Sequence, residues 1–272
     1  MPPVSVPPPS GADGHAVHRL RSARLAASAK PFVARGSGGG RCDCCRLIAS
    51  HCVCAWRPRV PTRAGMCLVM GDIEALKPSN TGWLVADVVA DTWAFGWSRT
   101  AVDPGLPALL ADPQWQPVLV FPGEFVPPER VVTTLEPVMT HDGPADGGRK
   151  PLFVLLDGTW SEARKMFRKS PYLDHLPVLS LQPGQVVSNY RLRRSARDNH
   201  FCTSEVAALC LALAGEARAA GALADWLDVF TAHYLSAKRN APLDHGSDAH
   251  ERLQALEKNS GVGWEASQPA PR

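Results

Sequence analysis

Residues 152–173, LFVLLDGTWSEARKMFRKSPYL, decide the fold of this chain, because an apolar run leads through a polar turn directly into a basic segment. The run Leu152–Leu156 has the pattern of a parallel strand that is covered on both faces. Asp157 follows at the carboxyl end of this expected strand. Ligands of open α/β sheets bind beyond the carboxyl ends of the strands, so Asp157, Thr159 and Trp160 are candidate catalytic residues.

The segment after Asp157 has the pattern of a capped amphipathic helix. Thr159 and Glu162 have the spacing of a capping box, which predicts a helix over Trp160–Lys169. One side of this helix is apolar, and the other carries four cations that are candidate RNA ligands: Arg164, Lys165, Arg168 and Lys169. The alternative is that Asp157 only caps a turn and that the basic side is a solvated helix face.

The bulk composition is that of a globular protein. The chain has 272 residues, of which 45% are hydrophobic and 20% are charged, enough to bury one sizeable core. No apolar run approaches the roughly 20 residues that span a bilayer, and the N-terminus lacks the apolar centre of a secretory signal. We therefore expect a cytoplasmic protein without a membrane partner. A net charge of +3 does not by itself indicate a nucleic-acid partner.

Strand-like and helix-like segments alternate from Gly65 onward, which predicts an α/β domain with a mostly parallel sheet. The expected strands are Met66–Met70, Trp83–Val89, Val118–Phe121, Leu152–Leu156 and Val178–Leu181. The expected helices are Leu106–Ala111, Trp160–Lys169, Ser204–Ala219 and Leu223–Ala237. We divide the chain into a disordered Pro/Gly-rich tail (1–40), a metal-binding segment (41–60), a main domain (61–240) and a flexible C-terminal tail (241–272).

Cysteines cluster near the start of the main domain. Cys42 and Cys45 form a C-x2-C pair, and Cys52 and Cys54 form a C-x-C pair after six intervening residues. Four thiolates at this spacing can converge on a tetrahedral zinc ion at about 2.3 Å, so we predict a structural zinc site. Disulfides are the alternative, which a cytosolic setting disfavours. Cys44 and His51 are substitute ligands, and an iron–sulfur cluster is a further alternative.

A second basic stretch begins at Tyr190 and contains the candidate RNA ligands Arg191, Arg193 and Arg194. Arginine presents a planar fork that suits phosphates, and tyrosine or tryptophan can stack on an unpaired base. Two basic segments flanking one candidate site indicate a nucleic-acid substrate, with RNA favoured. A hydrated surface without a ligand is the alternative.

Six segments occur in a fixed order along the chain: the four-cysteine segment, KPSNTG (77–82), FPGE (121–124), DGTWSEARKM (157–166), YRLR (190–193) and CTSE (202–205). Together they resemble the DTW-domain family over roughly residues 41–237, and the chain is similar to bacterial tRNA-uridine aminocarboxypropyltransferases. The family motif D-x-T-W matches Asp157, Thr159 and Trp160. Asp91–Trp93 spells DTW without a gap, but it lacks the capping box and the basic helix, so we expect a structural loop there.

The resemblance implies a SPOUT-like domain, a class that includes knotted folds, with S-adenosylmethionine as the donor substrate. It also implies transfer of the 3-amino-3-carboxypropyl group to N3 of a tRNA uridine, with release of methylthioadenosine. Asp157 would then act as a general base or orient the uracil. From their positions at strand ends and at a helix start, the candidate cofactor contacts are Phe121, Pro122, Gly123, Leu179 and Thr203. The alternatives are a SPOUT-like RNA methyltransferase and a zinc-stabilised RNA-binding adaptor without catalysis.

Overall fold

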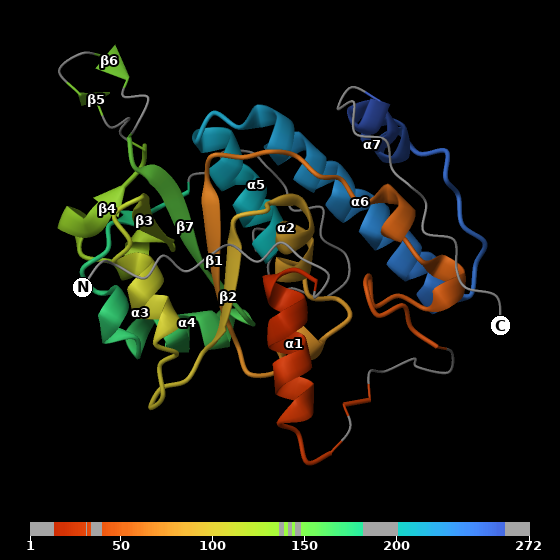
Figure 1. Ribbon diagram of the computed structural model, residues 1–272, viewed down its shortest axis with the longest axis horizontal. Coiled ribbons are helices and arrows are strands. Elements are labelled where there is room, and N and C mark those ends of the chain that lie inside the picture. Colours follow the sequence, from red (N-terminus) through yellow and green to blue (C-terminus); the bar gives the residue numbers. More distant parts are fainter. Residues whose placement is uncertain are drawn as a thin grey trace.

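A parallel sheet forms the centre of the protein. The computed structural model describes residues 14–30, 32–33, 40–135, 139–140, 143–144, 148–181 and 201–258. The strands are β1 (Gly65–Met70), β2 (Thr92–Gly96), β3 (Trp115–Val120), β4 (Val131–Val132), β5 (Met139–Thr140), β6 (Gly143–Pro144), β7 (Lys150–Asp157) and β8 (Val178–Leu179). Six of them form one sheet in the order β2-β1-β7-β3-β8-β4, with every neighbouring pair parallel (Figure 1). The predicted α/β class with a parallel sheet is confirmed.

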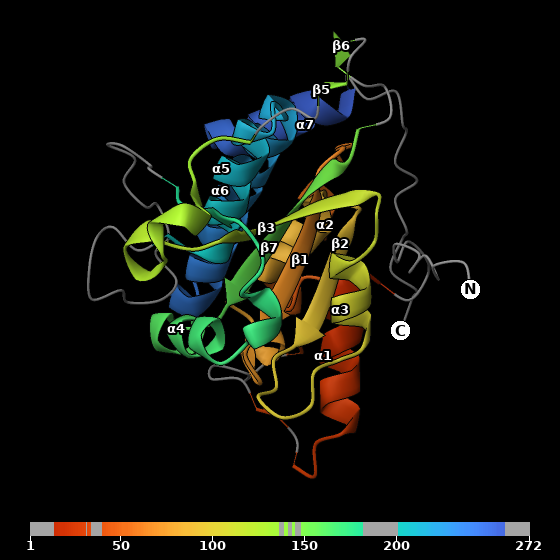
Figure 2. The ribbon, with the colours of Figure 1, turned by 90° about the vertical axis from the view of Figure 1, so that its left-hand side faces the viewer.

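Helices cover both faces of this sheet. Those described are α1 (Ala16–Ala26), α2 (Gly82–Val88), α3 (Gly105–Leu110), α4 (Trp160–Arg168), α5 (Thr203–Leu213), α6 (Ala217–Arg239) and α7 (Asp248–Lys258). Figure 2 shows the sheet with α5 and α6 on one side and α3 on the other. The β5–β6 hairpin projects away from the sheet (Figure 1).

The central strand β7 supplies side chains to two separate cores. Phe153 and Leu155 belong to the core that includes α2, α5 and α6, whereas Leu152 and Val154 belong to the core that includes α3 and α4. Successive side chains of a strand point to opposite faces, so a strand that is covered twice needs an uninterrupted apolar sequence. The apolar run therefore has the burial that its sequence predicts. Asp157, the last residue of β7, lies at the carboxyl edge of the sheet.

The strand predicted over Trp83–Val89 is wrong, because Trp83–Val88 belong to α2 and Val89 is its C-cap. All seven residues of α2 are buried and all except Asp87 are non-polar, so its sequence carries no periodicity that would separate a helix from a strand. The signal that was overlooked lies just before it. Asn80 Oδ1 accepts a hydrogen bond from the Trp83 N–H at 2.9 Å and so satisfies a backbone donor at the helix start.

Two other boundaries differ from the sequence prediction. The segment Asp91–Trp93, expected as a loop, leads into β2, which begins at Thr92. The single helix expected over Ser204–Ala219 is divided into α5 and α6, because Gly215 lies between them with φ of +79°. Glycine adopts this left-handed conformation without a Cβ clash and commonly ends a helix in this way.

Both terminal regions contain helices that composition alone did not reveal. Within the expected disordered tail, α1 buries Val17 and contacts β2 (Figure 1). Within the expected flexible C-terminal tail, α7 buries Leu253 against α6. Proline and glycine elsewhere in each region lowered its average apolar content, so composition did not predict these short helices. The remaining domain boundaries stay predictions.

The knot implied by the resemblance also stays a prediction, since residues 182–200, which join β8 to α5, lie outside the described residues. Among the helices that are described, none has both the length and the apolar character required to cross a membrane.

Candidate functional site

Asp157 is the buried polar group at the carboxyl edge of the sheet. Its residue is 3% exposed, and it ends β7 opposite Met70, the last residue of β1. Its backbone carbonyl accepts a hydrogen bond from the Gly71 N–H at 2.8 Å. Strand pairing therefore fixes the position of the Asp157 backbone. A buried carboxylate requires hydrogen-bond partners.

Two donors from distant segments hold the Asp157 carboxylate. Asn80 Nδ2 donates to Oδ2 at 2.7 Å, and Thr203 Oγ1 donates to Oδ1 at 2.7 Å. Asn80 belongs to the KPSNTG segment, and Thr203 begins α5 in the CTSE segment. Three motifs that are far apart in the sequence thus meet at one side chain. Thr203, expected as a cofactor contact, is a direct partner of the candidate catalytic group.

Asn80 is the site residue that sequence reasoning missed. The KPSNTG segment stood out as a polar turn next to an apolar run, but no local signal connected it to Asp157. The connection comes from the pairing of β1 with β7, which brings the segment after β1 beside the end of β7. Gly82 lets the two approach closely, because a Cβ at Gly82 would overlap Asp157 Oδ2.

Thr159 and Glu162 form the predicted capping box at the start of α4. The Glu162 N–H donates to Thr159 Oγ1 at 3.3 Å, and Glu162 Oε2 accepts from the Thr159 N–H at 2.8 Å. Thr159 Oγ1 also donates to Glu162 Oε2 at 2.6 Å. The Thr159 hydroxyl thus serves the helix start, which fixes the direction in which α4 leaves Asp157.

Aromatic side chains form a shelf beside this helix, made of Phe121, Phe125, Trp160 and Phe167. The Phe121 ring lies nearly parallel to the Phe167 ring at 4.3 Å and to the Trp160 ring at 5.6 Å between centroids. Phe121 is buried, whereas Trp160 is 39% exposed and Phe125 is 36% exposed. This aromatic shelf therefore presents flat apolar surface to solvent next to the motif that carries Asp157.

The four predicted cations, three on α4 and Lys169 at its C-cap, are all exposed, and Ala163 and Met166 are buried on the opposite side. The Arg164 guanidinium lies 4.9 Å from the centre of the Phe125 ring, and Lys165 Nζ lies 5.5 Å from that of Trp97. The amphipathic pattern is confirmed. The other predicted RNA ligands, Arg191, Arg193 and Arg194, lie outside the described residues.

The remaining candidate cofactor contacts follow β3 or, in the case of Leu179, end β8, at the same edge as Asp157. Leu179 is fully buried in the core that faces α5, so it offers a ligand only its backbone. Phe121 points to the other face, in the core with α4. Pro122 and Gly123 are half-buried, and the Gly123 N–H donates to Ser180 Oγ at 3.0 Å. The structure thus brings these positions to one edge and directs their side chains to two faces.

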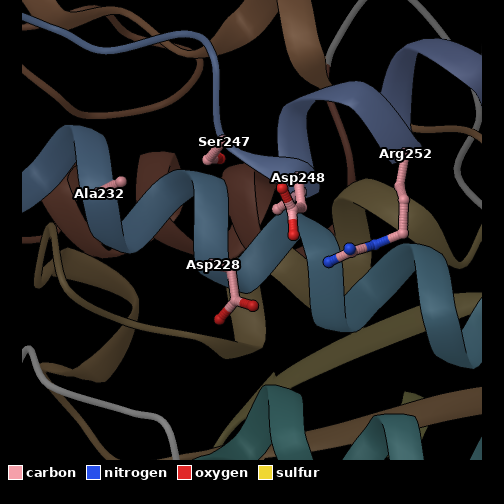
Figure 3. Close-up of a pocket in the computed structure, with 6 residues that line it drawn as sticks. Asp228, Ala232, Ser247, Asp248 and Arg252 are labelled. Atoms are coloured by element: carbon pink, nitrogen blue, oxygen red, sulfur yellow. The ribbon is translucent and has the colours of Figure 1, made fainter.

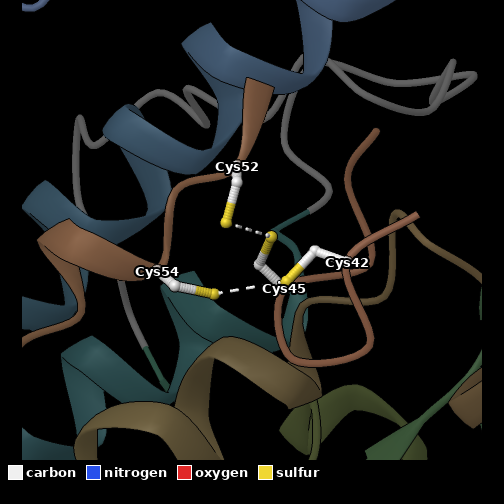
Figure 4. Close-up of side chains that lie close together, drawn as sticks. All are labelled: Cys42, Cys45, Cys52 and Cys54. Atoms are coloured by element: carbon white, nitrogen blue, oxygen red, sulfur yellow. Dashed lines mark hydrogen bonds between the residues drawn. The ribbon is translucent and has the colours of Figure 1, made fainter. Parts of the chain in front are cut away.

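The four predicted cysteine ligands converge on one point (Figure 4). Cys42 Sγ lies 3.6 Å from Cys54 Sγ, Cys45 Sγ lies 3.7 Å from Cys52 Sγ, and all four sulfur atoms lie within 4.8 Å of one another. Sulfur atoms bound tetrahedrally to zinc at about 2.3 Å are about 3.8 Å apart, so the set fits a structural zinc ion. These separations are too long for a disulfide, in which the sulfurs are about 2.05 Å apart.

The substitute ligands lie outside this set. Cys44 is exposed, and it is not among the four converging sulfurs. His51 is buried with both ring nitrogens engaged, Nδ1 by Ser50 Oγ at 2.9 Å and Nε2 by the Ala241 carbonyl at 2.9 Å.

Three of these thiols, Cys45, Cys52 and Cys54, have shifted pKa values. A hydrogen bond with Cys54 lowers the pKa of Cys45 to about 5, and burial raises the pKa of Cys52 to about 11. The hydrogen bond to Cys45 raises the pKa of Cys54. One thiolate is therefore favoured among neighbouring thiols, and a divalent cation would allow the others to ionise as ligands.

Arg46 connects the cysteine cluster with the Asp157 site. Its backbone has φ of +67°, in the left-handed region that costs a non-glycine residue about 1–2 kcal/mol. Its guanidinium lies 4.0 Å from the centre of the Trp83 ring and donates to the carbonyls of Lys77 at 2.9 Å and Asn80 at 3.3 Å. The residue next to Cys45 thus braces the loop that holds Asp157.

An open hollow of about 440 Å³ lies elsewhere, between α6 and the start of α7 (Figure 3). It is lined by Asp228, Ala232, Ser247, Asp248, Ala249 and Arg252. Arg252 is engaged by Asp225, whose Oδ1 accepts from Nη2 at 2.7 Å. None of the residues described around Asp157 lines this hollow, so it is separate from the site at the sheet edge.

Comparison with known proteins agrees with the arrangement of these motifs. No solved structure matches the chain. The model of the DTW domain matches residues 39–235, a range that includes the cysteine cluster, Asn80, the D-x-T-W motif and Thr203. The chain therefore belongs to the DTW domain family, a family of tRNA-modifying enzymes.

Proposed function

We propose that this protein transfers the 3-amino-3-carboxypropyl group of S-adenosylmethionine to N3 of a tRNA uridine and releases methylthioadenosine. The observation that carries the proposal is the convergence of Asn80 and Thr203 on the buried carboxylate of Asp157. The partly exposed aromatic shelf and a row of cations flank the same motif. The family supports tRNA as the substrate, which these surfaces suit.

The reaction is an alkyl transfer. It converts the positively charged sulfonium into a neutral thioether and releases the N3 proton. S-adenosylmethionine supplies a sulfonium that makes the attached carbons electrophilic. The bond from uridine N3 to the methionyl methylene forms while the bond from that carbon to sulfur breaks, and its electron pair leaves neutral methylthioadenosine. The N3 proton is lost in the same process. Alignment of N3 with the methylene rather than with the methyl group decides the product, so positioning is the main requirement on the protein.

Asp157 is the residue that we assign to the uracil. A carboxylate can accept up to about four hydrogen bonds, so one held by Asn80 and Thr203 can also accept the uracil N3–H. It would orient N3 and receive its proton, which then passes to water. The two donors keep the carboxylate from rotating, so it stays directed at the uracil N3–H during the transfer.

The aromatic shelf is the surface that we assign to a nucleobase. A uridine within folded tRNA must swing out before an enzyme can reach N3, and a swung-out base gains stacking on an aromatic ring. Trp160 directly follows Thr159, so its exposed ring belongs to the same short motif as the Asp157 carboxylate. The backbone at Phe121–Gly123, which follows β3, and at Leu179, the last residue of β8, is the proposed place of the sulfonium donor.

The cations of α4 are the proposed contacts to tRNA phosphates, together with Arg191, Arg193 and Arg194. Such contacts position a nucleic acid without reading its sequence, and they make binding depend on salt. The cysteine cluster would hold a structural zinc ion that organises its own short segment. These assignments agree with a cytosolic enzyme that acts on tRNA.

The test is product analysis with pure full-length protein, tRNA and S-adenosylmethionine. We expect mass spectrometry of the digested nucleosides to show a uridine carrying the added group, with methylthioadenosine in equal amount. Formation of S-adenosylhomocysteine and a methylated base would replace the proposal with methyl transfer. Binding of tRNA without any product from the donor would replace it with a non-catalytic adaptor.

A further inference from the structure

Three histidines gather where α7 returns to α6. His233 lies on α6 and His250 on α7, and both are completely buried. His245 precedes α7 and is exposed. Their ring nitrogens include a set of three atoms that all lie within 4.8 Å of one another. The two buried imidazoles hydrogen-bond with each other, and the set of three contains no carboxylate.

The hydrogen bonds of the two buried rings leave their Nε2 atoms opposed. His233 Nδ1 lies 3.2 Å from the backbone carbonyl of His51. A carbonyl can only accept, so Nδ1 carries the proton and Nε2 of the neutral ring presents a lone pair. His233 Nε2 lies 3.2 Å from His250 Nε2, whose ring is held on its other side by Ser247 Oγ, 2.7 Å from Nδ1.

This arrangement matches the geometry of imidazoles on a metal. Nitrogen atoms bound tetrahedrally to zinc at about 2.0–2.1 Å are about 3.4 Å apart, close to the observed separation of the two Nε2 atoms. Metal-binding histidines are typically oriented by a second hydrogen bond from the other ring nitrogen to a carbonyl or a hydroxyl group. The His51 carbonyl and the Ser247 hydroxyl occupy these outer positions.

The third ring is positioned by an aromatic side chain from the cysteine segment. The His245 ring stacks on Trp56 with 5.6 Å between centroids and 15° between planes. Trp56 also meets His250 edge-on at 4.6 Å. The exposed third ligand leaves a side open to solvent, where water can complete a tetrahedral set.

We propose that His233, His245 and His250 bind one zinc ion, distinct from the ion of the cysteine cluster. Imidazole nitrogen is a preferred ligand of zinc. His245 and His250 lie beyond residue 235, where the match to the DTW domain ends, so the site is formed with the C-terminal segment. The ion joins α6, α7 and, through the His51 carbonyl and Trp56, the cysteine segment. This site does not depend on the proposed transfer reaction.

The experiment counts zinc on the full-length protein. Protein already carrying zinc at the cysteine cluster is titrated with more zinc, excess metal is removed, and bound zinc is measured by elemental mass spectrometry. We expect wild-type protein to hold one more zinc per chain than His245→Ala. The exposed His245 can be changed without a core cavity, and α7 stays docked through the Arg252–Asp225 ion pair. His175→Ala, which removes another exposed histidine, should match wild type.

Cobalt gives a second measurement of the same site. Co²⁺ added to zinc-loaded wild-type protein should give the visible absorption of a nitrogen-ligated tetrahedral ion, without the sulfur-to-metal band that thiolates produce. His245→Ala should lose this absorption, whereas His175→Ala should keep it. Equal zinc content in wild type and His245→Ala, or an unchanged cobalt spectrum, would show that the histidines only pack and hydrogen-bond with one another.

Discussion

The residues Asp, Thr and Trp occur together twice in this chain, at opposite edges of the same sheet. Asp157–Trp160 follows the carboxyl end of β7, whereas Asp91–Trp93 stands at the amino end of β2. At the carboxyl edge, the loops after several parallel strands meet at the start of helices, and side chains from distant segments converge. At the amino edge the same residue types have no such neighbours in the described structure, which shows that strand direction decides their use.

Each member of the second triplet has a structural task instead. The Asp91 carbonyl accepts from the Met66 N–H at 2.8 Å, and the Thr92 hydroxyl donates to the Val89 carbonyl at 2.6 Å. Trp93 is 5% exposed and packs edge-on against Trp115 at 5.3 Å. In the D-x-T-W motif, by contrast, the carboxylate is held by side-chain donors and the tryptophan is partly exposed.

The two aspartates should give the largest difference in activity. Asp157→Asn removes the charge that we assign to N3, and loss of a general base costs about 10²–10⁴-fold in rate. We expect single-turnover transfer to fall by that factor, while binding of S-adenosylmethionine measured by calorimetry persists. Asp91→Asn keeps the backbone carbonyl that the fold uses and should leave the rate unchanged. Full activity of Asp157→Asn would remove the proposed base.

Two glycines extend the comparison to the packing at each edge. Gly82→Ala would press a methyl group into Asp157 Oδ2, and displacement of a catalytic group by about 1 Å can cost about 100-fold in rate. In Gly65→Ala the new Cβ would lie 2.9 Å from the Trp115 ring at the amino edge. That variant should lose about 1–3 kcal/mol of unfolding free energy with little change in kcat. Urea unfolding and transfer assays on both variants would show whether the two effects separate.

Substitution of the two tryptophans should affect different properties, tRNA binding for Trp160 and stability for Trp93. Trp160→Ala removes exposed aromatic surface, so we expect tRNA binding to weaken by about 1–3 kcal/mol, the stacking contribution of one base. Trp93→Ala opens a buried cavity and should lower the unfolding free energy by about 3–5 kcal/mol. Binding measurements below the melting temperature of each variant distinguish the two losses. If Trp160→Ala binds tRNA as wild type does, the aromatic shelf is not a base platform.

The smallest expected effect is on the salt dependence of tRNA binding. Each phosphate contact removed should reduce the slope of log K against log salt concentration by about 0.7–0.9. Lys165→Gln and Arg168→Gln on α4 should each show this reduction. Lys150→Gln, at the opposite end of β7, should keep the wild-type slope. Equal slopes for all four proteins would place the tRNA away from α4.

Local patterns were sufficient to predict the element that carries the motif. The uninterrupted run Leu152–Leu156 and the capping box at Thr159 depend on neighbours within a few residues, and both are confirmed. The cysteine spacing likewise predicted four converging sulfurs. Where the periodicity carries no information, as in the entirely buried α2, the helix was taken for a strand.

Contacts between distant segments could not be predicted in the same way. The bond from Asn80 to Asp157 joins residues 77 positions apart, and it depends on β1 lying next to β7 in the sheet. The cluster of His233, His245 and His250 depends on the return of α7 to α6, in a tail whose composition indicated flexibility. Sheet order and helix docking are tertiary properties, and no spacing within one segment encodes them.

Arg46 joins the metal-binding segment to the loop that carries Asn80. Its strained backbone is part of the turn that starts with Cys42 and Cys45, while its guanidinium grips the carbonyl of Asn80. Loosening that turn by chelation or thiol oxidation would withdraw this contact from Asn80 and would also disturb the core that includes Cys45 and Leu47. Under the proposed function, loss of the metal would therefore lower the transfer rate through the bond from Asn80 to Asp157 as well as through stability.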